Sequence, residues 1–275
     1  MLKVRETPCK TILNKSELAD FTLNCYVGCS HRCLYCYARY MKKFKDRPED
    51  WGYFVDVKIN APEILTKQIL KIRPPKEVFM SSICDGWQPL EAKYQLSQAC
   101  LKILLEAGFE VSILTKSSLI LRDFDLLEAY KTPSLGMTIT TLDRNLQKVL
   151  EPYASESSER LNTLKIARER GIKTWVFLGP LIPEFTDTKA NLEALFRALD
   201  GLNLDQIYVD RLNLRWGVLD SLKKGLSRGE YANFRLLLYK CINPTKYQEY
   251  SQQLKDKTLE CAHQFSLSDK VIFCF

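Results

Sequence analysis

The stretch EVFMSSICDGWQPLEAKYQLSQACLKILLEAGFEVSILTK, residues 77–116, decides the fold of this chain. It opens with a β-rich run over 77–84, continues into a helical pattern, and closes with a second β-rich run over 110–116. One face of the helical part carries apolar or small side chains: Leu96, Cys100, Ile103, Leu104 and Ala107. Gly108 stands where a glycine ends a helix. A strand, a helix and a strand in this order predict two parallel strands joined by a right-handed crossover.

The same alternation continues on both sides of this stretch. Further strands are expected over 21–24, 134–143, 173–183 and 206–214, and the helices between them over 61–72, 155–170 and 188–199. Ser155 is the expected N-cap of the second of these helices, and Gly171 its expected end. Six strands separated by helices predict an α/β fold, a (β/α)6 partial TIM barrel, because six units are too few to close an eight-stranded barrel. In such folds the functional site lies at the C-terminal ends of the strands.

The chain is expected to form a single domain, residues 1–275, with the partial-barrel core over about 20–215. From about Trp216 the strand–helix rhythm changes. Two helical stretches, about 229–241 and 245–264, lead to a terminal β-like KVIFCF segment. We interpret residues from about 216 to 275 as a short helical C-terminal extension packed on the same body.

Composition restricts the class of protein. The 275 residues are 46% hydrophobic and 27% charged, as in an ordinary soluble protein. No apolar run approaches the roughly 20 residues that span a bilayer, and the N-terminus lacks an apolar signal-peptide core. We therefore expect a cytoplasmic protein with no membrane partner. The net charge of +7 favours anionic partners, either nucleic acid or an acidic electron donor. A solvated basic face explains the short run Lys42, Lys43, Lys45 and Arg47 equally well.

Three cysteines cluster in GCSHRCLYCYARY, residues 28–40, with Cys29, Cys33 and Cys36 spaced by three and then two residues. In a long chain without an export signal, such a cluster indicates metal binding or thiol chemistry rather than a disulfide framework. A structural zinc site needs four ligands, usually as two separated pairs. Three thiolates can instead hold a [4Fe–4S] cluster with one iron left open for a substrate or cofactor. Zinc, with His31 as a fourth ligand, and a chance cluster are the alternatives.

This motif, with the aromatic Tyr35 before its last cysteine and a strand directly before it, resembles the cluster motif of the radical S-adenosylmethionine (SAM) superfamily. The resemblance implies a [4Fe–4S] cluster on Cys29, Cys33 and Cys36, with SAM chelated to the open iron. It also implies that an electron from the cluster splits SAM into methionine and a 5′-deoxyadenosyl radical, which abstracts a hydrogen atom from the substrate. The chain shows no second cysteine cluster, so a ferredoxin or flavodoxin is the expected electron donor.

Longer segments resemble the spore photoproduct lyase-like family over most of residues 10–190. They are NCYVGCSHRCLYCYARY, DGWQPLEAKYQL, LTKSSLILRDFDLL, TITTLDRNLQKVLEPYA with SERL, and GPLIPEFTD. The resemblance implies that Tyr35 lies near the adenine of SAM and that Asp85 serves its ammonium group. It places Lys116 at the SAM carboxylate, a charge-assisted contact. Thr138 and Thr140 are candidates for the ribose or carboxylate. The turn that ends at Pro183 and the segment 209–211 are expected to line the adenosine pocket.

Two residues are candidates for catalysis. The resemblance implies a cysteine that returns a hydrogen atom to the product in the lyases of this family, and it places that position at Ser82 of this chain. Cys84 lies two residues further on, which places it on the same face of the expected strand. It is a candidate hydrogen donor, a contact to the methionine part of SAM, or a core residue; we favour the SAM contact. Tyr37, which ends the Cys-x-Tyr-Cys-Tyr run shared with that lyase, is the second candidate.

Three functions compete on this evidence. The first is a radical SAM enzyme acting on a DNA lesion of the spore photoproduct type. It is supported by aromatic and basic residues near the expected site, on which bases can stack: Tyr37, Arg39, Tyr40, Trp51, Tyr53, Trp87, Arg211, Arg215 and Trp216. The second is a radical SAM enzyme that modifies a peptide, a tRNA or a small metabolite. The third is a non-catalytic iron–sulfur or zinc protein that binds nucleic acid, which would not bind SAM.

Overall fold

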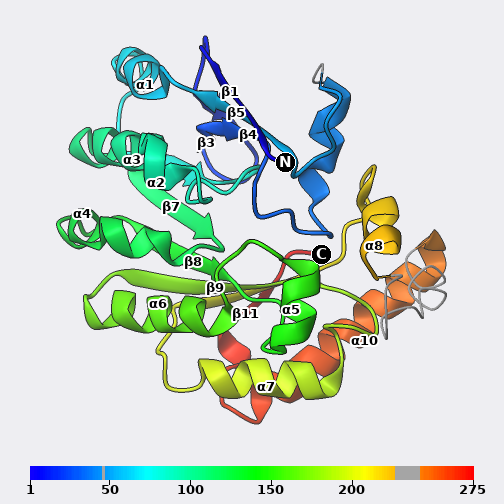
Figure 1. Cartoon of the computed structure of the whole chain (residues 1–275). Coiled ribbons are helices and arrows are strands. Elements are labelled where there is room, and N and C mark those ends of the chain that lie inside the picture. Colours follow the sequence, from blue (N-terminus) through cyan, green and yellow to red (C-terminus); the bar gives the residue numbers. More distant parts are fainter. Residues whose placement is uncertain (45–46, 227–241) are drawn as a thin grey trace.

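A sheet of eight strands runs through the computed structural model, which describes residues 1–44, 47–226 and 242–275 (Figure 1). The order of its strands is β11-β10-β9-β8-β7-β6-β3-β2, and all neighbours are parallel except the antiparallel pair β2–β3. Their bounds are β2 (Leu13–Lys15), β3 (Phe21–Leu23), β6 (Glu77–Met80), β7 (Glu110–Thr115), β8 (Ser134–Thr138), β9 (Lys173–Leu181), β10 (Gln206–Arg211) and β11 (Val271–Phe273).

The six strands expected from the sequence are confirmed as β3 and β6 to β10, adjacent to one another in chain order. The resulting α/β sheet is open rather than a closed barrel, with β2 and β11 at its two edges. All six strands end before the expected residue, and the differences are largest for β6, which ends at Met80, and β8, which ends at Thr138. Ser81 adopts φ +73°, a left-handed conformation that turns the chain out of the strand. Ser82 and Cys84 therefore lie in a loop, and the prediction that they share a strand face is wrong.

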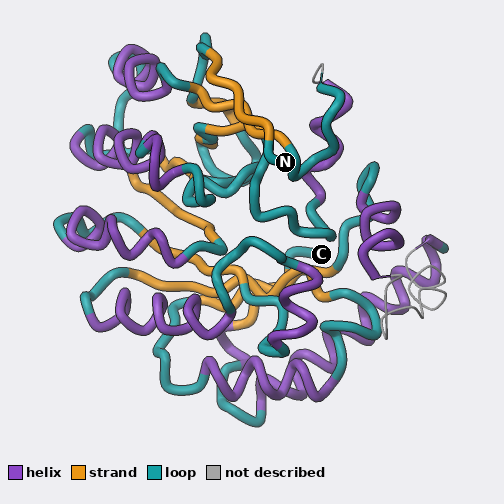
Figure 2. Tube along the Cα trace, viewed as in Figure 1, coloured by secondary structure: helices purple, strands orange, loops and turns teal. Residues whose placement is uncertain are grey.

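Helices flank the sheet. Figure 1 shows α1, α3, α4 and α6 along one side of the row of strands. Figure 2 gives the same view with helices in purple and strands in orange. The helices are α1 (Ala61–Ile69), α2 (Glu91–Tyr94), α3 (Leu96–Glu106), α4 (Phe124–Glu128), α5 (Arg144–Leu150), α6 (Ser157–Glu169), α7 (Lys189–Leu199), α8 (Val218–Leu226) and α10 (Pro244–His263). Short 3₁₀ helices are η1 (Tyr37–Phe44), η2 (Ser118–Asp123) and η4 (Ser268–Lys270). Among the described residues, no helix is long and apolar enough to cross a membrane.

Two glycines end helices as expected, whereas the expected N-cap of α6 is a different residue. Gly108 and Gly171, with φ of +79° and +75°, lie directly after the C-caps of α3 and α6. The expected N-cap Ser155 is wrong, because Glu156 takes that position and forms a capping box with Glu159. The Ser155 hydroxyl instead accepts a hydrogen bond from the main chain of Ser118 at 2.9 Å.

The C-terminal part joins the sheet directly. Strand β11 pairs in parallel with β10, with Ile207 opposite Val271 and Val209 opposite Phe273. Helix α10, capped by the Asn243 side chain, matches the expected helix over about 245–264. The other expected helix, over about 229–241, lies outside the described residues.

A second, smaller sheet was not expected. Its order is β1-β5-β4, with β1 (Lys3–Thr7) parallel to β5 (Phe54–Lys58) and β4 (Tyr26–Val27) antiparallel to β5. Because β4 ends one residue before Gly28, this sheet sets where the cysteine segment begins.

Candidate active site

The cysteine loop, residues 28–36, begins with a tight approach to β5. Gly28 has φ +95°, and a Cβ atom at this position would lie 2.2 Å from the main-chain oxygen of Phe54. Any side chain here would therefore displace the loop from the small sheet. Cys29 and Cys33 are buried, and Cys36 is half-buried. All three are free thiols.

The three thiols share one electrostatic environment. Burial, followed by the neighbouring charges of Asp85 and the other cysteines, raises the pKa of Cys29 well above its ordinary value. Burial raises the pKa of Cys33 to about 12. Metal ions reverse this effect, since a bound thiol is deprotonated. Among residues 1–44, 47–226 and 242–275, no three His, Cys, Asp or Glu side chains converge on a single metal ion. An iron–sulfur cluster places less stringent demands, because each thiolate binds a different iron and the thiolates stand further apart.

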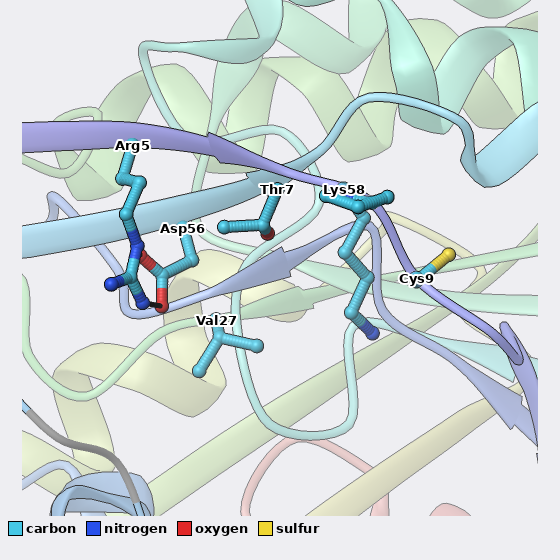
Figure 3. Close-up of a pocket in the computed structure, with 7 residues that line it drawn as sticks. Arg5, Thr7, Cys9, Val27, Asp56 and Lys58 are labelled. Carbon is cyan, nitrogen blue, oxygen red and sulfur yellow. Dashed lines mark hydrogen bonds and ion pairs between the residues drawn. The ribbon is translucent and has the colours of Figure 1, made fainter.

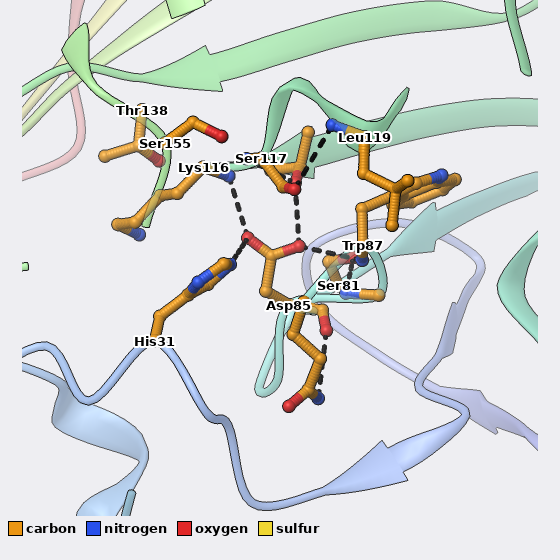
Figure 4. Close-up of polar contacts among 12 residues, drawn as sticks. His31, Ser81, Asp85, Trp87, Lys116, Ser117, Leu119, Thr138 and Ser155 are labelled. Atoms are coloured by element: carbon orange, nitrogen blue, oxygen red, sulfur yellow. Dashed lines mark hydrogen bonds and ion pairs between the residues drawn. The ribbon is translucent and has the colours of Figure 1, made fainter. Parts of the chain in front are cut away.

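Asp85 lies beside the cysteine loop and is surrounded by donors (Figure 4). One carboxylate oxygen accepts from the Trp87 main chain at 2.9 Å and from the Thr115 hydroxyl at 2.7 Å. The other accepts from the Lys116 main chain at 2.7 Å and lies 3.2 Å from Nε2 of His31. Burial by itself raises the pKa of Asp85, but the His31 ring and these donors lower it well below its ordinary value. Three hydrogen bonds and the 3.2 Å approach of the His31 ring therefore surround this carboxylate.

Lys116 and Thr138 follow or end neighbouring strands, β7 and β8, and Figure 4 shows both near Ser155. The Lys116 ammonium lies 5.8 Å from the centroid of the Tyr35 ring. Within the described part of the chain it has no hydrogen bond or salt bridge. Burial lowers the pKa of Lys116, but the charges of Cys33, Glu151 and Asp85 outweigh it and raise that pKa. The Thr138 hydroxyl is buried and has no partner in the described residues. The ends of these two strands therefore present one ammonium and one hydroxyl group that have no hydrogen-bond partner in the described residues.

A buried ion pair, Glu151 with Arg160, holds the Tyr35 side chain in place; it was not predicted from the sequence. Glu151 and Arg160 are 1% and 0% exposed and form a salt bridge. The Tyr35 hydroxyl donates to Glu151, and the Thr140 hydroxyl donates to the same carboxylate at 3.3 Å. Arg160 also donates to the main-chain oxygens of Thr138 at 2.8 Å and Ser155 at 2.9 Å. Both residues fall in segments that carry the family resemblance, but their positions in the sequence do not reveal their burial.

Cys84 and Tyr37 border the loop after β6. Cys84 is 3% exposed, and its main chain is held at 3.3 Å by the side-chain oxygen of Asn24. Burial and the nearby Cys36 raise the pKa of Cys84 to about 12. The Tyr37 hydroxyl donates to the main-chain oxygen of Ser82, and burial raises its pKa. The two residues therefore flank the same short segment, with the Cys84 thiol on the buried side.

The turn after β9 lies against the cysteine loop. Pro183 is buried, and the preceding Ile182 belongs to an apolar cluster that also contains Cys33 and Tyr35. Helix α8 contributes to the same cluster, and a Cβ atom at its Gly225 would lie 2.1 Å from the Leu34 side chain. These contacts bring the expected adenosine-lining turn next to the cysteines.

Partly exposed aromatic rings and exposed cations lie next to the segment that directly follows the cysteine loop. The Arg215 guanidinium lies 5.9 Å from the centroid of the Tyr37 ring and 5.1 Å from that of Tyr40. The Lys43 ammonium lies 5.0 Å from the centroid of the Trp216 ring, which is 49% exposed. We call these five residues the aromatic–cationic surface. On the other side of the loop, Arg32 lies between two further tyrosine rings, Tyr53 and Tyr153.

A cavity of about 320 Å³ opens on the small sheet rather than at the cysteines (Figure 3). Its charged side chains are already paired: Arg5 makes two 3.1 Å hydrogen bonds to Asp56. Lys58 donates to the main-chain oxygen of Asn24 at 2.7 Å. Because these charged side chains are paired within the protein, we assign this cavity no functional role.

Comparison with known proteins identifies related sequences. A sequence model described as "Radical SAM superfamily" matches residues 23–196. An uncharacterized protein of Methanocaldococcus jannaschii is 34% identical over 190 residues, which is 68% of this chain and 71% of that protein. An uncharacterized protein of Acidianus two-tailed virus is 33% identical over 213 residues, 72% of this chain and 69% of that protein. A "Radical SAM Nalpha-GlyT isomerase" of Pseudomonas phage M6 is 25% identical over 189 residues, 66% of this chain and 37% of that protein.

Solved structures agree on the fold. Spore photoproduct lyase complexed with a dinucleoside spore photoproduct superposes with a TM-score of 0.71 at 16% identity. The match covers 99% of this chain and 82% of the lyase chain. A mutant of the lyase with bound AdoMet, which is SAM, and the dinucleoside superposes with a TM-score of 0.69 at 16% identity, covering 100% of this chain and 82% of the lyase.

Proposed function

The chain belongs to the radical SAM superfamily and is an enzyme, and we propose that it binds a [4Fe–4S] cluster on Cys29, Cys33 and Cys36. When bound together, such a cluster and SAM supply a 5′-deoxyadenosyl radical that removes a hydrogen atom from the substrate. The three free thiols of one loop fit this cluster, and the strand ends next to them fit SAM.

One observation carries this proposal: the uncommitted ammonium of Lys116 and the buried, partnerless hydroxyl of Thr138 lie at adjacent strand ends. A buried polar group without a partner is costly, so such groups indicate a missing ligand. A carboxylate matches both, because ammonium and hydroxyl each donate to it. Lys116 and Thr138 would hold the SAM carboxylate.

The other residues expected to contact SAM would border its adenosine or hold neighbouring groups in place. Tyr35, fixed by Glu151, would present its main chain to the adenine, and the turn at Pro183 would border the adenosine. The Thr140 hydroxyl already donates to Glu151, so Thr140 would act mainly by holding that carboxylate. Asp85, which already accepts three hydrogen bonds and lies 3.2 Å from the His31 ring, would support the loops on both sides of SAM rather than bind its ammonium directly.

Anaerobic reconstitution with iron and sulfide tests this proposal. The parent protein should turn brown, hold about four irons per chain, bleach in air and release 5′-deoxyadenosine from SAM on reduction. Cys33→Ala should lose the cluster and the cleavage together. Cys261→Ala, which removes a buried thiol of α10, is the control and should keep both. A full cluster in Cys33→Ala would show that the ligand assignment is wrong.

We further propose a nucleic acid as the substrate. The aromatic–cationic surface offers partly exposed rings on which bases can stack and cations that can contact phosphates. It adjoins the cluster ligands directly, because Tyr37 follows Cys36. The solved lyase holds a dinucleoside, which supports a substrate built from nucleotides. Because Ser82 stands at the lyase's donor position, a reaction other than dimer splitting is compatible with the same site.

Deuterium transfer identifies the substrate class. Deuterated oligonucleotides with and without a thymine lesion, a tRNA pool and a peptide pool would each be incubated with the reduced enzyme and SAM. Deuterium in 5′-deoxyadenosine from an oligonucleotide supports the proposal. Transfer from the tRNA pool alone would keep a nucleic acid as the substrate and exclude the DNA lesion, whereas transfer from the peptide pool alone would overturn the proposal. A protein that binds metal and nucleic acid but not SAM would be the non-catalytic alternative.

A further inference from the structure

We infer that Gln88 is a positioning residue that fixes Cys29, and with it the cysteine loop, in the geometry that receives the cluster. The inference rests on the proposed function, since it assumes that the three thiolates hold iron. Gln88 belongs to no expected ligand set, and it lies in the loop between β6 and α2.

The Gln88 amide bonds to the main chain on both sides of Cys29. Its oxygen accepts from the Ser30 N–H at 2.8 Å. Its nitrogen donates to the Gly28 carbonyl at 3.2 Å and to the Asp85 carbonyl at 3.2 Å. The side chain is 0% exposed, so water cannot replace these bonds. One planar amide thus fixes two main-chain groups that are separated only by the ligand.

The segment that carries Gln88 is itself anchored. Asp85 binds the main chain of Lys116 at 2.7 Å and lies 3.2 Å from Nε2 of His31, inside the cysteine loop. The other nitrogen of His31 lies 2.9 Å from the main-chain oxygen of Tyr153. Residues 85–88 therefore contact the cysteine loop at Gly28, Ser30 and His31, on both sides of Cys29, and connect it to the strand end that carries Lys116.

These bonds matter because the loop has no regular secondary structure between Gly28 and Cys36. Without Gln88, the Ser30 N–H and the Gly28 carbonyl would be buried and unpaired, which is unfavourable for both groups. The segment would then relax towards other partners, and Cys29 would leave its position opposite Cys33 and Cys36. Groups that orient metal ligands typically change metal affinity by about 10- to 100-fold when mutated.

The test compares iron retention in two matched variants. Gln88→Met keeps the volume of the side chain and removes all three hydrogen bonds. Gln68→Met is the control, because Gln68 also makes three hydrogen bonds to main-chain groups, those of Ile12 and Leu13, away from the cysteines. After anaerobic reconstitution, an external iron chelator is added and iron release is followed by absorbance. Circular dichroism and thermal unfolding of the proteins before reconstitution report any general loss of structure.

We expect Gln88→Met to release iron at least about 10-fold faster than the parent, and Gln68→Met to release it at the parental rate. Equal rates for Gln88→Met and the parent would overturn the inference, as would equally fast release from both variants. If Gln88→Met does not fold, Gln88→Glu, which keeps an acceptor for Ser30, takes its place in the same comparison. A parent protein that takes up no iron would contradict the proposed function itself, which separates the two failures.

Discussion

Directly after β7, the Lys116 ammonium lies 5.8 Å from the centroid of the Tyr35 ring and makes no hydrogen bond or salt bridge with the described residues. If it holds the SAM carboxylate, Lys116→Met should weaken SAM binding to the reconstituted protein by about 10- to 100-fold. This range follows from the roughly 1.5–3 kcal/mol of a charge-assisted hydrogen bond. Equilibrium dialysis with labelled SAM measures the change. Lys148→Met, at an exposed position of α5, should leave the affinity unchanged, and an unaltered affinity in Lys116→Met would remove Lys116 from the SAM site.

Cys84 is the second residue whose surroundings predict an outcome. Its thiol is 3% exposed and close to Cys36, which favours a contact within the cofactor site over hydrogen donation to a bulky substrate. Cys84→Ser should therefore give the same products as the parent enzyme, because a hydroxyl fits the same space. Cys84→Ala should lower the free energy of unfolding by about 1 kcal/mol, a typical cost of a core substitution.

Product analysis by mass spectrometry distinguishes the roles of Cys84. Misrouted or trapped products from Cys84→Ser, with normal 5′-deoxyadenosine formation, would identify Cys84 as the hydrogen donor instead. Unchanged SAM binding and unchanged products in both variants would leave it a core residue.

At the scale of a single strand, β10 carries a half-buried carboxyl group near its end, that of Asp210. Burial raises the pKa of Asp210 to about 6, only partly offset by the N–H and the charge of Arg211. A carboxyl whose pKa is raised on folding stabilises the protein while it is protonated. That contribution is present below pH 4 and is lost as the pH rises through about 6.

Asp210→Asn should therefore be more stable than the parent at pH 7.5, by about 2 kcal/mol, and similar to it at pH 4. Urea unfolding of the protein without cofactor at both pH values measures the difference. Asp256→Asn, at an exposed position of α10, should show no comparable change with pH. An equal effect of Asp210→Asn at both pH values would indicate lost packing rather than a titrating group.

Elements rather than single residues also determine how the cysteine loop is enclosed. Strand β4 leads into it from the small sheet, the end of α5 bonds to Leu34 and Tyr35, and α8 packs against Leu34. Each of these elements comes from a different part of the chain. The loop therefore acquires its shape only when the whole sheet and its connections have formed.

The whole molecule carries a net charge of +7, which should attract an acidic electron donor. We propose flavodoxin or ferredoxin, because outside the cysteine loop the described residues bring only Cys25 and Cys100 into direct thiol contact, which is too few thiols for a second iron–sulfur cluster. Raising the ionic strength from about 0.01 to 0.5 M should slow reduction by flavodoxin by about 10-fold or more, since the Debye length shrinks several-fold. Stopped-flow absorbance of the cluster follows the rate.

Charge reversal locates the docking site of this donor. Lys43→Glu, next to the cysteine loop, should slow reduction at low salt. Lys67→Glu on α1 changes the net charge equally and should have a smaller effect. A rate that is independent of salt would argue against electrostatic docking.

Local sequence patterns were sufficient to predict the main strands, the cysteine site and several helix ends. The spacing of apolar residues in the stretch 77–116 and its neighbours was sufficient to predict six parallel strands and their order, since strand and helix periods are properties of contiguous sequence. The spacing of Cys29, Cys33 and Cys36 likewise indicated an iron–sulfur site and the superfamily. Glycine positions such as Gly108 indicated where helices end, because a left-handed residue suits few other side chains.

Tertiary structure alone decided how the site is held. Glu151 and Arg160 give no sign of burial in the sequence, yet they fix Tyr35; Gln88 lies 59 positions after Cys29 and bonds on both sides of it. The small sheet pairs β1 with β5, about fifty positions apart, and β11 joins β10 across the C-terminal helices. Such pairings depend on which distant segments the folded chain brings together. They cannot be predicted from the pattern of residues within any one segment. The sequence therefore determined the chemistry of the site, whereas the tertiary contacts determined the geometry in which that chemistry is presented.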